Sequence, residues 1–152
     1  MKLAVFDFDS TLMDGETIDL LANAYNKKEE VSQITMEAMN GELDFYQSLK
    51  RRVEALKGMP LPLVEEVCNN LPYNPGAKEL ISALKNKNYK VVVFSGGFDE
   101  GVIAGKKILG YDMHFSNTLH HKNGLLTGEV GGEMMFSYSK GRMLKKVQSL
   151  LG

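Results

Sequence analysis

A short apolar run that ends abruptly in acidic residues is the sequence feature that most constrains the fold. Residues 3–6 read LAVF, and residues 7–11 read DFDST. An apolar run of this length that feeds a polar loop is typical of a strand buried in a parallel sheet. In open α/β sheets, ligands gather at the carboxyl ends of the strands. The pattern therefore predicts that Asp7 and Asp9 lie at the ligand-binding edge of such a sheet.

The apolar spacing becomes helical between Glu16 and Leu71, and it predicts about four short helices. Breakers at residues 58–60 (GMP) and 72–76 (PYNPG) punctuate this region, and the second set marks the return to the main domain. We therefore expect a main domain of residues 1–13 and 74–152, with residues 14–73 inserted after the first strand as a helical subdomain.

The remainder of the chain alternates strands and helices. Apolar residues at positions 77, 80, 81 and 84 predict a helix, and residues 90–94 (KVVVF) predict a buried strand that ends in Ser95-Gly96-Gly97. The other expected elements are a helix at about 101–109, a short run at 113–115, a hairpin of 118–122 and 125–130 around Asn123-Gly124, and a helix at 139–151. The alternation indicates an α/β protein with about three sheet strands plus a hairpin.

Composition limits the class of protein and its partners. The chain has 152 residues, of which 43% are hydrophobic, so one folded domain with a sizeable core is expected. Lys and Arg total 18 against 19 Asp and Glu, and a net charge of -1 gives no overall field for nucleic acid or an anionic membrane. The single Cys68 and the lack of a targeting or membrane segment favour the cytoplasm.

The pair Asp7 and Asp9 has two interpretations. Two carboxylates at i and i+2 after a strand repel each other unless a cation lies between them, and Mg²⁺ takes one or two carboxylates while keeping waters for exchange with phosphate oxygens. The alternative is that both residues serve only a turn or a helix N-cap, because Asp is common in both places. The pair alone leaves the choice open.

Ser95-Gly96-Gly97 adds the complementary chemistry at the end of the second core strand. A hydroxyl and a backbone without Cβ atoms can approach an anion and offer it N–H groups, although the same tripeptide is also an ordinary turn. One strand end that is acidic beside another that donates hydrogen bonds suggests a phosphoryl site at the carboxyl edge of the sheet.

Arg52 lies within an apolar helical stripe, whereas Arg51 points about 100° away from it. The other members of the stripe are Phe45, Leu49, Val53 and Leu56. An arginine on an inward face requires an anion, but its aliphatic stem can also follow the apolar surface to solvent.

The three histidines, His114, His120 and His121, lack an acidic partner at ligand spacing and are expected on the surface. Residues 134–136 (MMF) are expected in a loop packed on the sheet.

The DFDST stretch resembles the DxDx[T/V] nucleophile motif of the haloacid dehalogenase superfamily, and residues 93–98 (VFSGGF) resemble its second motif in the form that phosphoserine phosphatases use. Glu16, the helical insertion and Lys140 match that pattern in order and spacing over essentially the whole chain. The resemblance implies a HAD-like Rossmannoid sheet with a C1-type helical cap after the first strand.

The resemblance also implies a two-step phosphoryl transfer. Asp7 is the implied nucleophile that forms an aspartyl-phosphate, and Asp9 the implied acid and base. Mg²⁺ is expected between the Asp7 carboxylate and the Asp9 backbone carbonyl. The phosphoryl-binding residues it implies are Ser95, Gly96, Gly97 and Lys140.

For the cap, the resemblance implies that Arg52 binds a substrate carboxylate and Glu16 its ammonium group, with Met39 and Phe45 on the cap side. The expected activity is Mg²⁺-dependent hydrolysis of O-phospho-L-serine, the last step of serine synthesis. Three alternatives remain at this point: a phosphatase for another small phosphometabolite, a phosphotransferase, and a catalytically silent phosphate-binding domain.

One departure from the family pattern concerns the fourth, acidic motif, which should follow the helix of Lys140. No Asp occurs after Asp112, and Glu129 and Glu133 precede Lys140. Either the chain is a fragment of a longer enzyme whose C-terminal strands are missing, which is the interpretation we favour, or it is a short protein with a weakened metal site. Self-association through the open sheet edge follows as a hypothesis, because the last helix carries an apolar face of Leu144, Val147, Leu150 and Leu151.

Overall fold

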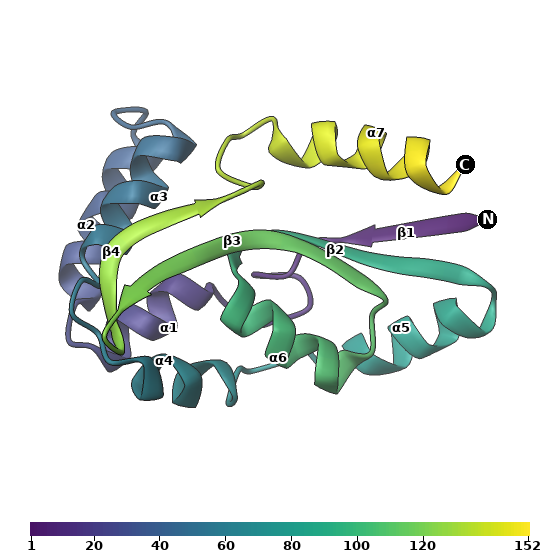
Figure 1. The fold of residues 1–152 in the computed structure, drawn as a ribbon, viewed down its shortest axis with the longest axis horizontal. Coiled ribbons are helices and arrows are strands. Elements are labelled where there is room, and N and C mark those ends of the chain that lie inside the picture. Colours follow the sequence, from purple (N-terminus) through teal and green to yellow (C-terminus); the bar gives the residue numbers. More distant parts are fainter.

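A four-stranded sheet forms the centre of the molecule in the computed structural model, which describes residues 1–152 (Figure 1). The strands are β1 (Lys2–Phe6), β2 (Tyr89–Phe98), β3 (Met113–Lys122) and β4 (Leu125–Gly132). Their spatial order is β1-β2-β3-β4; β1, β2 and β3 are parallel, and β4 is antiparallel to β3. The α/β class expected from the sequence is confirmed.

Helices cover both faces of the sheet. α5 (Ala77–Asn86) and α6 (Asp99–Leu109) lie on one face, and α7 (Ser139–Leu151) lies on the other (Figure 1). Successive residues of β2 point to opposite faces, so Val91 and Val93 pack with α5 and α6, whereas Val92 and Phe94 pack with α7. Burial on both sides is the reason that β2 is a continuous apolar run.

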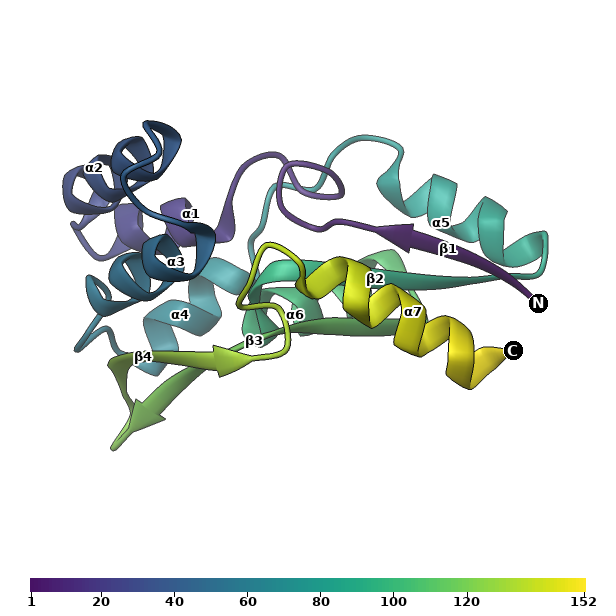
Figure 2. The same cartoon turned by 90° about the horizontal axis from the view of Figure 1, so that it is seen from above.

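The segment between β1 and α5 folds into four helices, as the sequence predicts. α1 (Thr17–Ala24), α2 (Lys28–Met39), α3 (Phe45–Glu54) and α4 (Leu61–Cys68) gather at the end of the molecule opposite the two chain termini (Figure 2). We call these four helices the cap and the remainder of the chain the core. The hairpin of β3 and β4 packs against the cap, because Leu119 and Leu126 belong to the same hydrophobic cluster as the cap helices.

The two connections between cap and core run side by side. The backbone N–H of Asp14 donates to the carbonyl of Pro72 at 2.7 Å, and that of Asn74 donates to the carbonyl of Leu12 at 2.9 Å. An isolated bridge between Met13 and Tyr73 lies at the same place. The chain therefore leaves the core and returns to it through two linkers that are hydrogen-bonded to each other.

The hairpin differs from its expected form. The short run at 113–115 and the first hairpin arm are one ten-residue strand, β3, which pairs with β2 in its first half and with β4 in its second. A total of four strands, rather than three plus a hairpin, results. The turn itself is as predicted, because Asn123 and Gly124 both have positive φ (55° and 76°), as a two-residue type I′ turn requires.

The second difference concerns Ser95-Gly96-Gly97. The strand was expected to end at these residues, but β2 continues through them to Phe98, which pairs with Asn117 after a shift in register. The backbone groups expected to face an anion therefore belong to a strand end, in the irregular stretch between the paired residues Phe94 and Phe98.

Candidate active site

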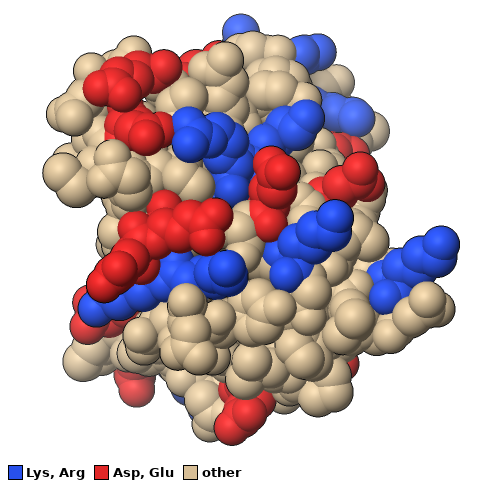
Figure 3. Space-filling view, turned by 90° about the vertical axis from the view of Figure 1, so that its left-hand side faces the viewer, with Lys and Arg blue, Asp and Glu red and all other residues tan.

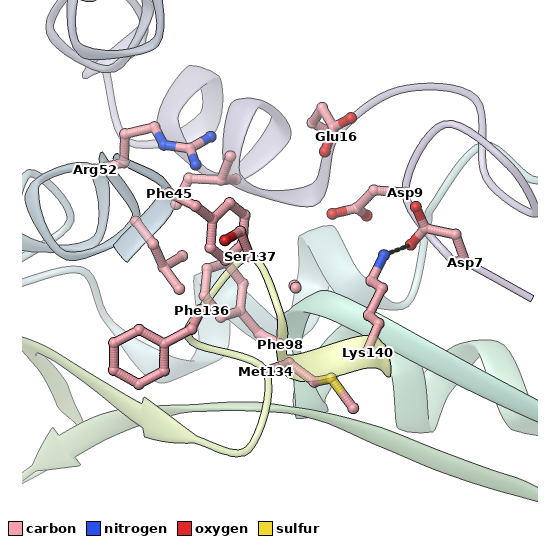
Figure 4. Close-up of a pocket in the computed structure, with 14 residues that line it drawn as sticks. Asp7, Asp9, Glu16, Phe45, Arg52, Phe98, Met134, Phe136, Ser137 and Lys140 are labelled. Atoms are coloured by element: carbon pink, nitrogen blue, oxygen red, sulfur yellow. Dashed lines mark ion pairs between the residues drawn. The ribbon is translucent and has the colours of Figure 1, made fainter. Parts of the chain in front are cut away.

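A cavity of about 360 Å³ opens where the carboxyl ends of β1 and β2, the cap and the start of α7 meet (Figure 4). The core and cap contribute opposite walls of this cavity. The wall residues that the sequence analysis singled out are Asp7, Asp9, Glu16, Phe45, Arg52, Gly96, Gly97 and Lys140. The structure thus brings together residues from the two ends and the middle of the chain.

Asp7 and Lys140 form an ion pair on the core side. Lys140 is the second residue of α7, and its Nζ lies 3.0 Å from Asp7 Oδ1 (Figure 4). The same oxygen accepts a hydrogen bond of 2.8 Å from the backbone N–H of Phe8. Nearly half of each side chain remains exposed, so this carboxylate is both oriented and accessible from the cavity.

Asp9 is held by a residue that the sequence analysis missed. The hydroxyl and the backbone N–H of Thr17 donate to Asp9 Oδ1 at 2.6 and 3.2 Å. Burial raises the pKa of Asp9 to about 7, despite these bonds to Thr17, which lower it. A side chain at Gly97 would bring its Cβ within 3.0 Å of Asp9 Oδ2, so glycine at this position gives the carboxylate its space. Asp9 can therefore exchange a proton near neutral pH.

Glu16 stands just before α1, on the wall between core and cap. Its Oε1 accepts a hydrogen bond of 2.8 Å from the hydroxyl of Ser10, a residue with a positive φ of 58° in the loop after β1. The loop and the first cap helix are thereby connected beside Asp9.

Arg52 reaches the cavity from the cap, whereas its neighbour does not. Arg52 Nε donates to the carbonyl of Ser48 at 3.3 Å, and burial lowers the pKa of its guanidinium while the carboxylates of Asp19 and Glu16 raise it. Arg51 instead pairs with Glu37 at 2.7 Å. The helical spacing separated these two arginines correctly, and Arg52 is the one that faces the cavity.

Two predicted site residues do not line the cavity. Ser95 is fully buried behind the wall, where its Oγ accepts a hydrogen bond of 2.9 Å from the N–H of Gly97. Met39, the last residue of α2, is 82% exposed, and its expected place on the cap wall is corrected. The buried face of α2 is set by Val31 and Ile34, and a residue five positions after Ile34 falls about 140° away from that face.

The loop between β4 and α7 is a part of the wall that the sequence analysis did not assign to the site. Met134, Phe136 and Ser137 line the cavity, although the loop was expected only to pack on the sheet. The buried side chain of Asn117 on β3 fastens it: Nδ2 donates to the carbonyls of Gly96 (3.1 Å) and Met134 (3.0 Å), and Oδ1 accepts from the N–H of Met134 (3.0 Å). An Asn within a strand is the one sequence signal that could have indicated this.

Charged side chains of both signs lie on the cap end of the molecule and in the cavity. Figure 3 shows acidic and basic groups interspersed over the cap end. Within the cavity, the carboxylates of Asp7, Asp9 and Glu16 face the cations of Lys140 and Arg52 (Figure 4). No group of three or more His, Cys, Asp or Glu side chains could hold a metal ion.

The donor set nevertheless fits a hard divalent cation. Such an ion is commonly bound by one or two carboxylates together with waters and a phosphate oxygen. Asp7 and Asp9 line the same cavity, and the side chain of Asp7 is nearly half exposed, so carboxylate oxygen is accessible to a cation there.

None of the helices combines the length and apolar character needed to span a membrane.

An accessible carboxylate at a strand end, a lysine 3.0 Å from it and a second carboxylate whose pKa is raised by burial fit one class: an α/β enzyme that transfers an anionic group through an acidic nucleophile. The sequence pattern of the family described as haloacid dehalogenase-like hydrolase matches residues 4–150. The chain belongs to this family.

Curated relatives support a narrower comparison. The chain is 65% identical over 152 residues to a phosphoserine phosphatase of Wolinella succinogenes and covers 74% of that protein. It is 47% identical over 151 residues to one of Methanocaldococcus jannaschii, of which it covers 72%. In both comparisons the match takes in 99% or more of this chain.

Solved structures agree with the fold. A phospho-aspartyl intermediate analogue of a phosphoserine phosphatase superposes with a TM-score of 0.92 at 47% identity, and a substrate-bound phosphoserine phosphatase complex superposes with the same score at 46% identity. Each match covers 99% of this chain and 72% of the solved one.

Proposed function

We propose that this chain hydrolyses O-phospho-L-serine to L-serine and phosphate through an aspartyl-phosphate intermediate. The observation that carries the proposal is the 3.0 Å pair of Lys140 and Asp7, because it orients a carboxylate at the floor of a cavity whose opposite wall holds Arg52. The identities of 65% and 47% to phosphoserine phosphatases support the substrate.

In the first step, a carboxylate oxygen of Asp7 attacks the phosphorus atom. A bond forms between this oxygen and phosphorus, and the bond from phosphorus to the ester oxygen breaks. The departing serine oxygen takes a proton from Asp9, whose pKa of about 7 keeps that proton available near neutral pH. Lys140 stabilises the charge that spreads over the phosphoryl oxygens.

In the second step, a water molecule attacks the phosphorus of the aspartyl-phosphate. Asp9, now ionised, takes a proton from this water, and the bond between phosphorus and the Asp7 oxygen breaks. Phosphate leaves, Asp7 returns as a carboxylate and Asp9 is protonated again. One acid/base group therefore serves both halves of the reaction.

The end of β2 holds the phosphoryl group in this proposal. Gly96 and Gly97 line the cavity without side chains, so the group can approach their backbone. The Ser95 hydroxyl lies directly behind them. Its oxygen accepts a hydrogen bond from the N–H of Gly97, so the hydroxyl proton remains available for a hydrogen bond to the phosphoryl group.

The cap recognises the amino-acid part of the substrate. Arg52 pairs with the carboxylate and Glu16 with the ammonium group, while the ring of Phe45 covers the apolar stem. In this division, residues 14–73 act as a selecting subdomain and residues 1–13 and 74–152 carry the chemistry. The paired linkers near Met13 and Tyr73 support these boundaries.

Mg²⁺ is the proposed cofactor, and the carboxylate of Asp7 and the backbone carbonyl of Asp9 would hold it. When bound, it acts as a Lewis acid that offsets the charge of an anionic nucleophile facing an anionic substrate. The accessible carboxylate of Asp7 on the cavity wall supports this choice.

Two further proposals concern the cellular setting. The reaction belongs to serine biosynthesis, and the protein lies in the cytoplasm, since the single unpaired Cys68 is in keeping with a reducing compartment.

A third proposal concerns self-association. Two copies of the chain associate through β1, which is an edge strand of the sheet. Beside β1 lies a hollow of about 200 Å³ that is lined in part by Val5, Phe94 and Leu144. Light scattering over a wide concentration range tests the association, and a mass that stays monomeric contradicts it.

Phosphate release from O-phospho-L-serine, with and without Mg²⁺, tests the function in this chain and in Asp7→Asn. We expect metal-dependent turnover that is lost in the variant, because an amide cannot form the covalent intermediate. Folding of the variant is checked by circular dichroism. A folded chain that releases no phosphate, or an Asp7→Asn variant that retains turnover, contradicts the proposal.

A further inference from the structure

The start of α3 touches the core through two neighbouring aromatic side chains. Phe45, the first residue of the helix, lies over Gly96 so closely that a Cβ there would meet its ring at 2.9 Å. The ring of Tyr46, the second residue, stacks on Phe136 of the core loop with centroids 4.8 Å apart and planes 13° apart. These contacts lie at the edge of the cavity that holds Phe45 and Phe136 (Figure 4).

The stacking continues along the loop that leads to α7, where Phe136 and Tyr138 are both partly exposed. The ring of Phe136 stacks on Tyr138 at 5.2 Å with planes 2° apart. Lys50 lies 5.3 Å from the ring of Tyr46, and Arg142 lies 5.6 Å from that of Tyr138. We call Tyr46, Phe136 and Tyr138 the aromatic column. It connects the cap helix α3 to the start of α7, the helix that carries Lys140.

The column acts on a helix whose first turn is fixed. Asp44 Oδ1 accepts from the N–H of Gln47 at 2.8 Å, and Gln47 Oε1 accepts from the N–H of Asp44 at 3.1 Å. This capping box defines where α3 begins. Arg52 follows Phe45 by seven residues, or about 10 Å along the helix axis. Fixing the start of α3 against the core therefore fixes how far the Arg52 guanidinium stands from the strand end at Gly96.

We propose that the aromatic column determines which substrate length the site accepts. The inference rests on the proposed function, in which Gly96 and Lys140 hold the phosphoryl group and Arg52 holds the carboxylate. The column joins the helix of Arg52 to the helix of Lys140, so it sets the separation between the two anion sites. A monoester with the spacing of phosphoserine meets both sites, and one with an additional methylene group does not.

The test compares kcat/KM for O-phospho-L-serine, O-phospho-L-homoserine and p-nitrophenyl phosphate in the parent chain and in Tyr46→Leu. Leucine keeps the apolar packing of Tyr46 beside the cap cluster but removes the stacking face. We expect the preference for phosphoserine over phosphohomoserine to fall about tenfold, the scale of discrimination by one methylene group. The rise in KM for phosphoserine should exceed any change in kcat, and the aryl phosphate, which has no carboxylate, should react as before.

Two variants complete the set. Tyr46→Phe retains the ring and should restore the parental preference. Tyr89→Leu removes an aromatic ring that also faces a lysine, Lys2, at the opposite end of the sheet, and should leave the preference unchanged. A preference in Tyr46→Leu equal to that of the parent overturns the proposal, as does an equal loss in Tyr89→Leu.

A binding measurement separates this inference from the proposed function. Calorimetry on Asp7→Asn gives the dissociation constants of both amino-acid phosphates without turnover. The quantity compared is the dissociation constant for phosphohomoserine divided by that for phosphoserine. If the parent chain releases no phosphate but Tyr46→Leu lowers this ratio in the Asp7→Asn background, the function fails and the column stands. If the parent chain turns over and the ratio is unchanged by Tyr46→Leu, the column fails and the function stands.

Discussion

The core and cap halves of the cavity are built in different ways. On the core side, Asp7 directly follows β1, Lys140 lies in the first turn of α7, and both are fixed by the backbone of elements packed into the sheet. On the cap side, Arg52 lies on one helix, and the cap meets the core through aromatic rings, a hydrophobic cluster shared with Leu119 and Leu126, and two linkers. In the proposed function, the side that performs chemistry is thus tied to the sheet, and the side that selects the substrate is held by packing against the hairpin and the loop before α7.

The largest expected effect tests whether the core half serves every substrate. Lys140→Ala removes the cation 3.0 Å from Asp7 and should lower kcat/KM by about a thousandfold, as loss of one strong transition-state contact commonly does. Because the contact involves the phosphoryl group, O-phospho-L-serine and p-nitrophenyl phosphate should be affected alike. Lys145→Ala, on the same helix, is the matched control. A loss confined to phosphoserine would show that Lys140 belongs to selection instead.

The second effect concerns the cap half alone. Arg52→Ala should lower kcat/KM for phosphoserine about a hundredfold, since it leaves a carboxylate without its buried partner, and should change aryl phosphate hydrolysis far less. Arg51→Ala provides a matched control, because Arg51 is the adjacent residue and pairs with Glu37 instead. Equal losses for the two arginines, or equal losses on the two substrates, would remove the distinction between core and cap.

The two halves also differed in how much of them the sequence could predict. Asp7, Asp9 and the end of β2 were predictable because strand ends meet at one edge of a parallel sheet, whatever else the chain does. Arg52 was separable from Arg51 because a helix has a fixed period. Met39 was misplaced because a family resemblance assigns a role but not the distance of a helix end from the cavity.

Residues that act through tertiary partners escaped the sequence analysis. Thr17 is a common residue for the start of a helix, and nothing local indicates that its hydroxyl reaches Asp9. Asn117 lies in a polar stretch, yet it is fully buried because the loop of Met134 returns over it from 17 residues away. Phe136 belongs to a loop whose ring partner, Tyr46, is 90 positions earlier in the chain.

A third prediction concerns Asn117, whose side chain joins the end of β2 to the loop before α7 in the core half of the site. Asn117→Ala leaves the carbonyls of Gly96 and Met134 and one N–H without partners in a buried place. The free energy of unfolding should fall by about 2 kcal/mol, a typical cost of buried unsatisfied groups. Urea denaturation measures this change, and Thr118→Ala, at the next and exposed position of β3, should cost less. Equal costs would mean that Asn117 contributes only strand packing.

The last prediction concerns the dependence of stability on pH through Asp9. Its pKa is about 7 in the folded chain, against about 3.9 in an unfolded one, so the folded state holds more protons between these values. The free energy of unfolding should therefore fall as pH rises from about 4 to 7, and it should do so less in Asp9→Asn. Melting temperatures at pH 5 and pH 8, in chelator to remove divalent ions, should show a smaller drop in Asp9→Asn by a few degrees.

The control for this measurement is Glu42→Gln, which removes one negative charge from an exposed loop. If Asp9→Asn and the parent chain lose the same stability between the two pH values, burial of the Asp9 carboxyl does not oppose its ionisation. The smaller drop, if also produced in the parent chain by added Mg²⁺, would identify the cation as the group that stabilises the ionised carboxylate. The half of the site that is most firmly fixed by the sheet would then also be the half whose metal ion raises the stability of the chain at neutral pH.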